Sequence, residues 1–155
     1  MPKPVIWTTL PTPEGLNFRG KNTLSSYLGI VFTAVENRSL TAQMPIDART
    51  LQPLGRMHGG ASAALAETVA SAAANYCIDL QKEICVGLEL NINHLRSVTK
   101  GTATAIASPL HLGRSTQVWD VKIYNEERQL TAVARLTLAV LKKKNPRSDR
   151  GGPEV

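Results

Sequence analysis

The chain of 155 residues fits a single domain, since most domains contain roughly 100 to 200 residues. Its 43% apolar and 19% charged residues are ordinary for a globular protein, and no apolar run reaches the roughly 18 residues of a membrane-spanning helix. The formal net charge of +6 raises the question of nucleic acid, but no basic face interleaved with aromatic residues supports it, so nucleic-acid binding is only a weak alternative.

The N-terminal half predicts two strands followed by a loop. Residues 1–15 lack the charged segment, apolar stretch and cleavage site of a signal peptide, so we expect a cytoplasmic protein. Residues 26–37 and 39–46 alternate loosely and are rich in β-branched and aromatic residues, which predicts a hairpin. Residues 47–60 contain Gly, Pro and polar residues without a period, which indicates a loop.

An alanine-rich helix is predicted over residues 60–78. Eight of the fourteen residues from 61 to 74 are alanine, which has the highest helix propensity, and that preference alone could explain the composition. So slim a helix also lets another element approach closely. Because it brings little apolar area of its own, a sheet that curls around it would compensate.

The C-terminal half predicts four strands, over residues 84–95, 101–114, 115–125 and 130–141. Two strands, one helix and four strands indicate an α+β fold, with the helix on one face of a largely antiparallel sheet. We expect one domain over residues 1–141 and a disordered tail over 142–155, whose five Lys or Arg outnumber two acids. Cys77 and Cys85 are expected to be buried free thiols without a role.

Glu67 is the first candidate for chemistry. The three-and-four spacing of a helix places it on a small, neutral face, with no Lys or Arg within one turn. An exposed surface glutamate is the simplest alternative. However, the flanking helix is apolar almost all round, which is typical of a buried helix. A buried carboxylate is costly without a partner or a task, which favours a functional role.

The second candidate is the junction of loop and helix at Met57, His58, Gly59 and Gly60. Unpaired backbone N–H groups and the positive end of the helix dipole meet there, and the glycines let an anionic oxygen come close. These are the components of an oxyanion hole. A helix start with glycines for its turn is the alternative.

Helix geometry separates these two candidates. Glu67 lies eight residues beyond Gly59, which is about 12 Å along the axis at 1.5 Å per residue. If the two groups act together, the acid comes from a second copy whose helix runs antiparallel. The active site would then lie at a dimer interface.

Two histidines and the metal question remain. His94 shares the parity of Val86, Leu88, Leu90 and Ile92, so it is expected to face the helix, as a core histidine or as part of a site. His111 is expected near a strand end, as a loop or ligand-contact residue. The three histidines have neither HxH nor HxxxH spacing, so no metal site is predicted.

Four segments in this order resemble the hotdog-fold acyl-CoA thioesterases, in particular the branch of the glutamate-dependent 4-hydroxybenzoyl-CoA and 1,4-dihydroxy-2-naphthoyl-CoA thioesterases and the enterobactin proofreading thioesterase. The resemblance covers residues 28–141. The segments are QP (52–53), GRMHGGASAALAETVAS (55–71), VGLELNINHLRS (86–97) and PLHLGRSTQVW (109–119).

The resemblance implies a curved, antiparallel six-stranded sheet wrapped around one long helix, in homodimers that assemble into homotetramers. It implies that Glu67 is the nucleophile or general base, that the Gly59 N–H polarises the thioester carbonyl, and that Gln52 and His58 orient the substrate. Ser71 and His94 match positions that place the water or line the acyl end, and Thr68 matches a position where a small hydroxyl residue usually stands. The region expected to meet the CoA phosphates comprises Arg96, Gly113, Arg114 and Ser115.

The predicted function is therefore hydrolysis of an aromatic or medium-chain acyl-CoA without a cofactor. The chain offers no serine or cysteine nucleophile with a matched base, so carboxylate attack or acid–base catalysis remains. The alternatives are a thioesterase that acts on a carrier protein, a hotdog hydratase or dehydratase, and a non-catalytic acyl-CoA-binding module. The sequence leaves the acyl group and the tetramer arrangement open.

Overall fold

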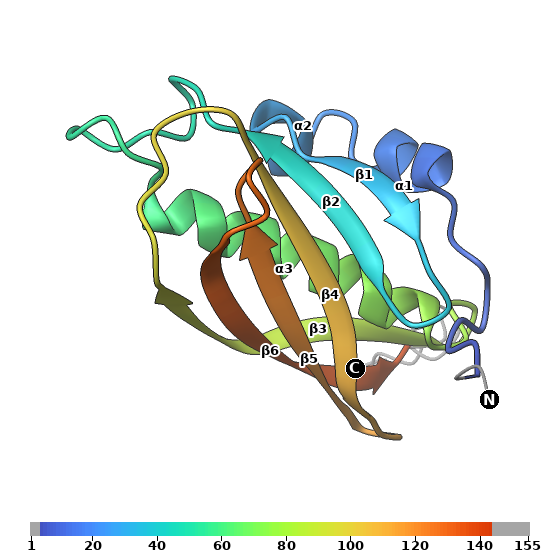
Figure 1. Cartoon of the computed structure of the whole chain (residues 1–155). Helices are drawn as coiled ribbons and strands as arrows, with labels where there is room; N and C mark the ends of the chain where they lie inside the picture. The colour runs from blue at the N-terminus through green and yellow to red at the C-terminus, as the bar shows by residue number, and fades with distance from the viewer. Residues whose placement is uncertain (1–3, 144–155) are drawn as a thin grey trace, which may run out of the picture.

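The computed structural model describes residues 4–143. Of the predicted tail, Lys142 is the last residue of a strand, and residues 144–155 lie outside the described residues. One six-stranded antiparallel sheet curves around one long helix (Figure 1), as predicted. The elements are α1 (Pro13–Arg19), α2 (Leu24–Tyr27), β1 (Val31–Val35), β2 (Leu40–Pro45), α3 (Gly59–Tyr76), β3 (Glu83–His94), β4 (Thr102–Leu112), β5 (Thr116–Tyr124) and β6 (Leu130–Lys142).

The two short helices were not predicted, and the expected strand over residues 26–37 was placed too early, because Leu24–Tyr27 is helical. Helix α1 begins where the Thr12 hydroxyl accepts a hydrogen bond from the Gly15 N–H at 3.1 Å, with Pro13 in the first helical position. A capping residue followed by proline is a recognisable helix start. The sequence therefore carried this signal.

The sheet order is β1-β2-β4-β5-β6-β3, so the strand that follows α3 lies at the far edge. Strand β3 pairs with β6 over its whole length, from Glu83 opposite Lys142 to His94 opposite Ala132. In Figure 1, β3 runs back along α3 and ends near the beginning of the helix. This return brings the end of β3 to the start of α3.

The core lies between the helix and the concave face of the sheet. Leu65 and Val69 are fully buried on the helix, and the sheet contributes larger side chains such as Trp119, Leu136 and Met44. Between them the helix presents buried alanines at positions 66, 70, 73 and 74. Most of the apolar bulk therefore comes from the sheet, and the slim helix lets the sheet close around it.

One side of α3 is only partly buried, so the expectation of a helix buried all round is wrong on this side. Glu67, Thr68, Ser71, Ala72 and Asn75 all keep intermediate exposure. They recur at spacings of three and four and therefore form one stripe along the helix. The sheet does not close over this stripe.

A β-bulge in β3 changes which residues face the helix. The pairing with β6 shifts between Gly87 and Glu89, so Leu88 is an extra residue. Before the bulge Cys85 is buried, whereas Val86 and Leu88 are exposed. The prediction that Val86 and Leu88 share the inward face is wrong, because the bulge reverses the alternation. Beyond it, Leu90 and Ile92 pack against the core as predicted.

Candidate active site

The loop before α3 is fixed to its surroundings by hydrogen bonds. The buried Thr50 hydroxyl donates to the Pro45 carbonyl at 2.9 Å, and the Thr50 carbonyl accepts from the His58 N–H at 2.8 Å. The Met57 N–H donates to the Val98 carbonyl at 2.7 Å, which joins the loop to the segment after β3. The start of α3 is therefore held from two sides.

The first amides of α3 are used unequally. The Gly60 N–H donates to His58 Nδ1 at 2.8 Å, and the N–H groups of Ala61 and Ser62 donate to the His58 carbonyl. Within residues 4–143 the Gly59 N–H has no hydrogen-bond acceptor. A free amide at the positive end of an 18-residue helix can stabilise an anionic oxygen.

His58 thus has a structural role in addition to the predicted one. Its ring nitrogen Nδ1 caps the helix, and this contact fixes the orientation of the ring. Only Nε2 remains to meet a substrate. The capping bond also explains why Gly59, rather than Gly60, keeps the free N–H.

His94 lies directly over Gly59. A Cβ built on Gly59 would come within 2.9 Å of His94 Nε2, so glycine is needed for this approach. His94 is exposed, which excludes the alternative of a core histidine. Its position at the end of β3 brings it to the helix start, as its parity predicted.

Four predicted residues line one cavity of about 310 Å³, which we call the helix-start cavity: Gln52, Gly59, His94 and Arg96. Sequence reasoning missed Arg56, Ser62 and Thr131, which also line it. Arg56 and Arg96 bring two positive charges, and none of the described lining residues is acidic. The cavity therefore suits an anionic ligand, although only proximity in the fold identifies Arg56.

Glu67 lies in the middle of α3 and is partly buried. Its Oε1 accepts a hydrogen bond from the Ser71 hydroxyl at 3.3 Å. Within residues 4–143, no Lys, Arg or His nitrogen lies within 4.0 Å of the carboxylate. The carboxylate is thus not consumed by an ion pair.

Gly87 of β3 makes room for Glu67. A Cβ built at Gly87 would lie 2.5 Å from Glu67 Oε1. Sequence reasoning missed this contact, although an isolated glycine within a strand often marks a bulge or a close approach. The structure has both features at this position.

Thr68 and Ser71 line a second cavity of about 440 Å³, which we call the mid-helix cavity. It extends along the partly buried stripe of α3 and reaches Tyr76 and the end of α1. The hydrogen bond from Ser71 connects its wall to Glu67. The predicted site residues on α3 therefore fall into two groups. Gly59 lines the helix-start cavity, and Thr68 and Ser71 line the mid-helix cavity beside Glu67.

The other predicted contacts, His111, Gly113, Arg114 and Ser115, lie at the turn between β4 and β5. This turn is at the opposite end of the molecule from the loop before α3 (Figure 1). Gln117, at the beginning of β5, donates to the carbonyl of Ala74 near the end of α3, at 3.4 Å. One chain does not bring these residues to Gly59.

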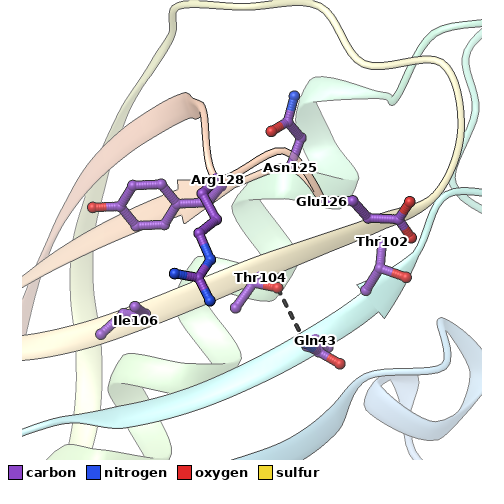
Figure 2. Close-up of a pocket in the computed structure, with 8 residues that line it drawn as sticks. Gln43, Thr102, Thr104, Ile106, Asn125, Glu126 and Arg128 are labelled. Carbon is purple, nitrogen blue, oxygen red and sulfur yellow. Dashed lines mark hydrogen bonds between the residues drawn. The ribbon is translucent and has the colours of Figure 1, made fainter.

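A larger cavity, of about 690 Å³, lies on the outer face of the sheet (Figure 2). Thr104 on β4 and Gln43 on β2 are hydrogen-bonded there at 3.2 Å, and Arg128 reaches over the strands from the turn before β6. None of the predicted site residues lines this cavity. Its size therefore does not make it the better candidate.

The part of the chain that the structure describes contains neither a candidate membrane-spanning helix nor a candidate metal site. No helix between residues 4 and 143 is long and apolar enough to cross a membrane. No group of three or more His, Cys, Asp or Glu residues in the same range could hold a metal ion.

Comparisons with known proteins identify the family. Residues 54–132 match the model of the thioesterase superfamily. The chain is 42% identical over 137 residues to both the 1,4-dihydroxy-2-naphthoyl-CoA hydrolase of Escherichia coli and the proofreading thioesterase EntH of Cronobacter sakazakii, covering 88% of this chain and 100% and 99% of those proteins.

The solved structures agree. A thioesterase from Haemophilus influenzae superposes with a TM-score of 0.89 at 43% sequence identity, covering 92% of this chain and 99% of that one. The predicted hotdog fold and the predicted thioester-hydrolase family are both confirmed. The chain belongs to the thioesterase superfamily.

Proposed function

We propose that this protein hydrolyses an acyl-CoA to a free acid and CoA, with Glu67 from one copy acting on a carbonyl held by the Gly59 N–H of a second copy. The distance between Gly59 and Glu67 within one chain supports this proposal. The free amide and the unpaired carboxylate lie about 12 Å apart along one helix. Gly59 lines the helix-start cavity, whereas Glu67 is connected through Ser71 to the mid-helix cavity. A second, antiparallel helix would join them.

The edge strand β3 supports a second copy. Val86 and Leu88 expose 37% and 64% of their surface, and β3 is twelve residues long. A long, apolar edge strand is a template for pairing with another chain. Two β3 strands paired about a two-fold axis would run antiparallel and would bring the stripe of α3 that contains Glu67 toward its counterpart.

The proposed chemistry divides between the two copies. The thioester carbonyl oxygen accepts the Gly59 N–H, which stabilises the negative charge of the tetrahedral intermediate. Glu67 either attacks the carbonyl carbon and forms an anhydride, which water then cleaves, or removes a proton from an attacking water. In both routes the C–S bond breaks and the CoA thiolate leaves. No cofactor is needed.

Charge in the helix-start cavity supports CoA as the leaving group. Arg56 and Arg96 would meet its phosphates, and we propose that Arg114 of a second copy meets them too. Two relatives carry names that refer to a CoA hydrolase and a proofreading thioesterase. We infer an aromatic or medium-chain acyl group, cytoplasmic activity and assembly of dimers into tetramers.

The first test is thiol release from a panel of aromatic and aliphatic acyl-CoA substrates. Glu67→Gln is expected to lower kcat by about 10² to 10⁴, which is the usual contribution of a positioned acid or base. Residual activity above a tenth of wild type would contradict the role of Glu67. Hydration of an enoyl-CoA without thiol release would indicate a hydratase, and binding without turnover a non-catalytic module.

A complementation test addresses the shared site. Glu67→Gln subunits are co-expressed with Gln52→Ala/His94→Ala subunits, each inactive alone. A mixed dimer then contains one intact site, so random mixing should restore about a quarter of wild-type activity. No recovery in verified mixed dimers would exclude a site that combines two copies.

A further inference from the structure

The mid-helix cavity combines an apolar wall with a cationic rim. Phe32, Ala72 and Leu80 are among its apolar lining residues, and Ser71 connects it to Glu67. Arg19 and Lys143 also line it, and none of its described lining residues is acidic. An apolar channel that ends at two positive charges suits an apolar ligand with an anionic end.

Both cations are held by contacts with the cavity walls. The Arg19 guanidinium lies 5.6 Å from the centroid of the Tyr76 ring, a distance typical of a cation–π contact. The Lys143 ammonium donates to the carbonyl of Leu80 at 2.6 Å. Two elements far apart in sequence therefore direct positive charge to one cavity.

Neither cation is neutralised by an ion pair in the part of the chain that the structure describes. The hydrogen bond from Lys82 lowers the pKa of Asp79, and Lys143 adds only the smallest contribution. The Asp79 carboxylate is paired with Lys82 at 2.9 Å. A ligand carboxylate would therefore not have to displace an ion-pair partner of either cation.

We propose that the mid-helix cavity selects acyl groups with a carboxylate at the end far from the thioester, held by Arg19 and Lys143. The proposal rests on the proposed function, because it requires the thioester carbonyl to lie at Glu67. Tyr76 is nine residues beyond Glu67, so the rim lies about 13.5 Å farther along the helix. An extended acyl chain of about twelve carbons spans this distance, since each C–C bond advances the chain by roughly 1.25 Å.

Matched substrates test the proposal. Dodecanedioyl-CoA and dodecanoyl-CoA have the same chain length and differ in a terminal carboxylate or methyl group. Wild-type enzyme is expected to have the higher kcat/KM for dodecanedioyl-CoA. The Arg19→Gln/Lys143→Gln variant should lower the ratio of kcat/KM for dodecanedioyl-CoA to that for dodecanoyl-CoA about fivefold, mainly through KM, as two exposed ion pairs would.

Two controls separate selectivity from other effects. Lys122→Gln removes an exposed cation that does not line the cavity, and it should leave the ratio unchanged. Inhibition by free CoA should be equal in the double variant and the wild type. Weaker inhibition in the double variant would assign the cations to the CoA phosphates and overturn the proposal.

The remaining outcomes are distinguishable. Equal or better turnover of dodecanoyl-CoA, with a ratio that the double variant does not change, would overturn the proposed selectivity and leave the thioesterase function intact. No thiol release from any acyl-CoA would overturn both. The proposal is supported if the ratio of kcat/KM for the two substrates falls in the double variant but not in Lys122→Gln, while inhibition by free CoA is unchanged.

Discussion

At each edge of the sheet, an asparagine side chain forms hydrogen bonds with the backbone of the edge strand. The two edges differ in the length of strand that stays open. At β1 the Asn17 side chain accepts the Phe32 N–H at 2.8 Å and donates to the Phe32 carbonyl at 3.0 Å. At β3 the Asn75 side chain makes the same pair of bonds with Cys85, at 2.9 and 3.2 Å. In both places an asparagine amide replaces the next strand.

The difference lies in how much of each strand stays open. Strand β1 has five residues and packs against α1, whereas β3 has twelve and is clamped only at its third residue. Beyond the clamp lie Val86, Gly87 and Leu88, where β3 is an open edge. Natural sheets usually block long apolar edges, so an unblocked edge favours a partner strand. The β1 edge is therefore covered, whereas the β3 edge is open to a partner strand.

A charged side chain on the open edge should have the largest effect on dimerisation and activity. Leu88→Lys is expected to dissociate the proposed dimer and abolish thiol release, because each Leu88 would lose about 1.5 to 3 kcal/mol of burial against a partner. Dissociation is measured by sedimentation, and activity at the same protein concentration. The matched control is Val31→Lys on β1, where the side chain is also exposed. If both variants behave alike, the two edges do not differ in function.

Gly87 links the open edge to the candidate acid. Gly87→Ala would place a methyl group against Glu67 Oε1 and displace the carboxylate. We expect kcat to fall about 10- to 100-fold, since a misplacement of about 1 Å can cost about 10² in rate. Gly15→Ala is the control, because Gly15 lines neither the helix-start cavity nor the mid-helix cavity and its Cβ would meet only the Thr12 hydroxyl, at 3.1 Å. Unchanged kcat in Gly87→Ala would show that Glu67 needs no exact position.

Much of the fold could be predicted because its signals are local. The alanine-rich composition identified α3, and segments rich in β-branched and aromatic residues identified the six strands. The helix start also followed from local chemistry, since the glycines after His58 are visible in the sequence. The parity of β3 placed His94 toward the helix, and the structure has it over Gly59.

The errors and omissions depend on contacts between distant residues. The bulge at Leu88 reverses the exposure of Val86. Gly87 is a local signal for a bulge, but which side chains then face the helix depends on the pairing with β6. Arg56 joins the helix-start cavity only through the folding of its loop. The helix was expected to be buried all round, but the partly buried stripe depends on where the sheet stops. Composition alone does not encode that boundary.

The asparagine clamps allow a direct comparison of stability. Asn17→Ala and Asn75→Ala should each lower the free energy of unfolding by about 1 to 3 kcal/mol, because each leaves a partly buried backbone N–H and carbonyl without a partner. Denaturant unfolding measures both changes. Asn17→Ala should retain kcat, since Asn17 lies away from Glu67. A loss of less than 0.5 kcal/mol, roughly the scatter of surface substitutions, would mean that water replaces the amide.

The smallest expected effect is on the reactivity of Cys85, which lies beside the open part of β3. Burial, with the neighbouring Cys85 second, raises the pKa of Cys77 to about 12, and burial raises that of Cys85 to about 11, from a usual value of 9.0. Both thiols should therefore react slowly with iodoacetamide at pH 8. The pKa of each thiol is higher in the folded state than in the unfolded state. The protonated thiols therefore stabilise the folded state fully below pH 9, and this contribution to the free energy of unfolding falls as the pH rises toward 11.

Asn75→Ala should speed alkylation of Cys85, whose backbone Asn75 holds, whereas Asn17→Ala should not. Equal rates in the two variants, read by mass spectrometry of the labelled peptides, would mean that the clamp does not control access to β3.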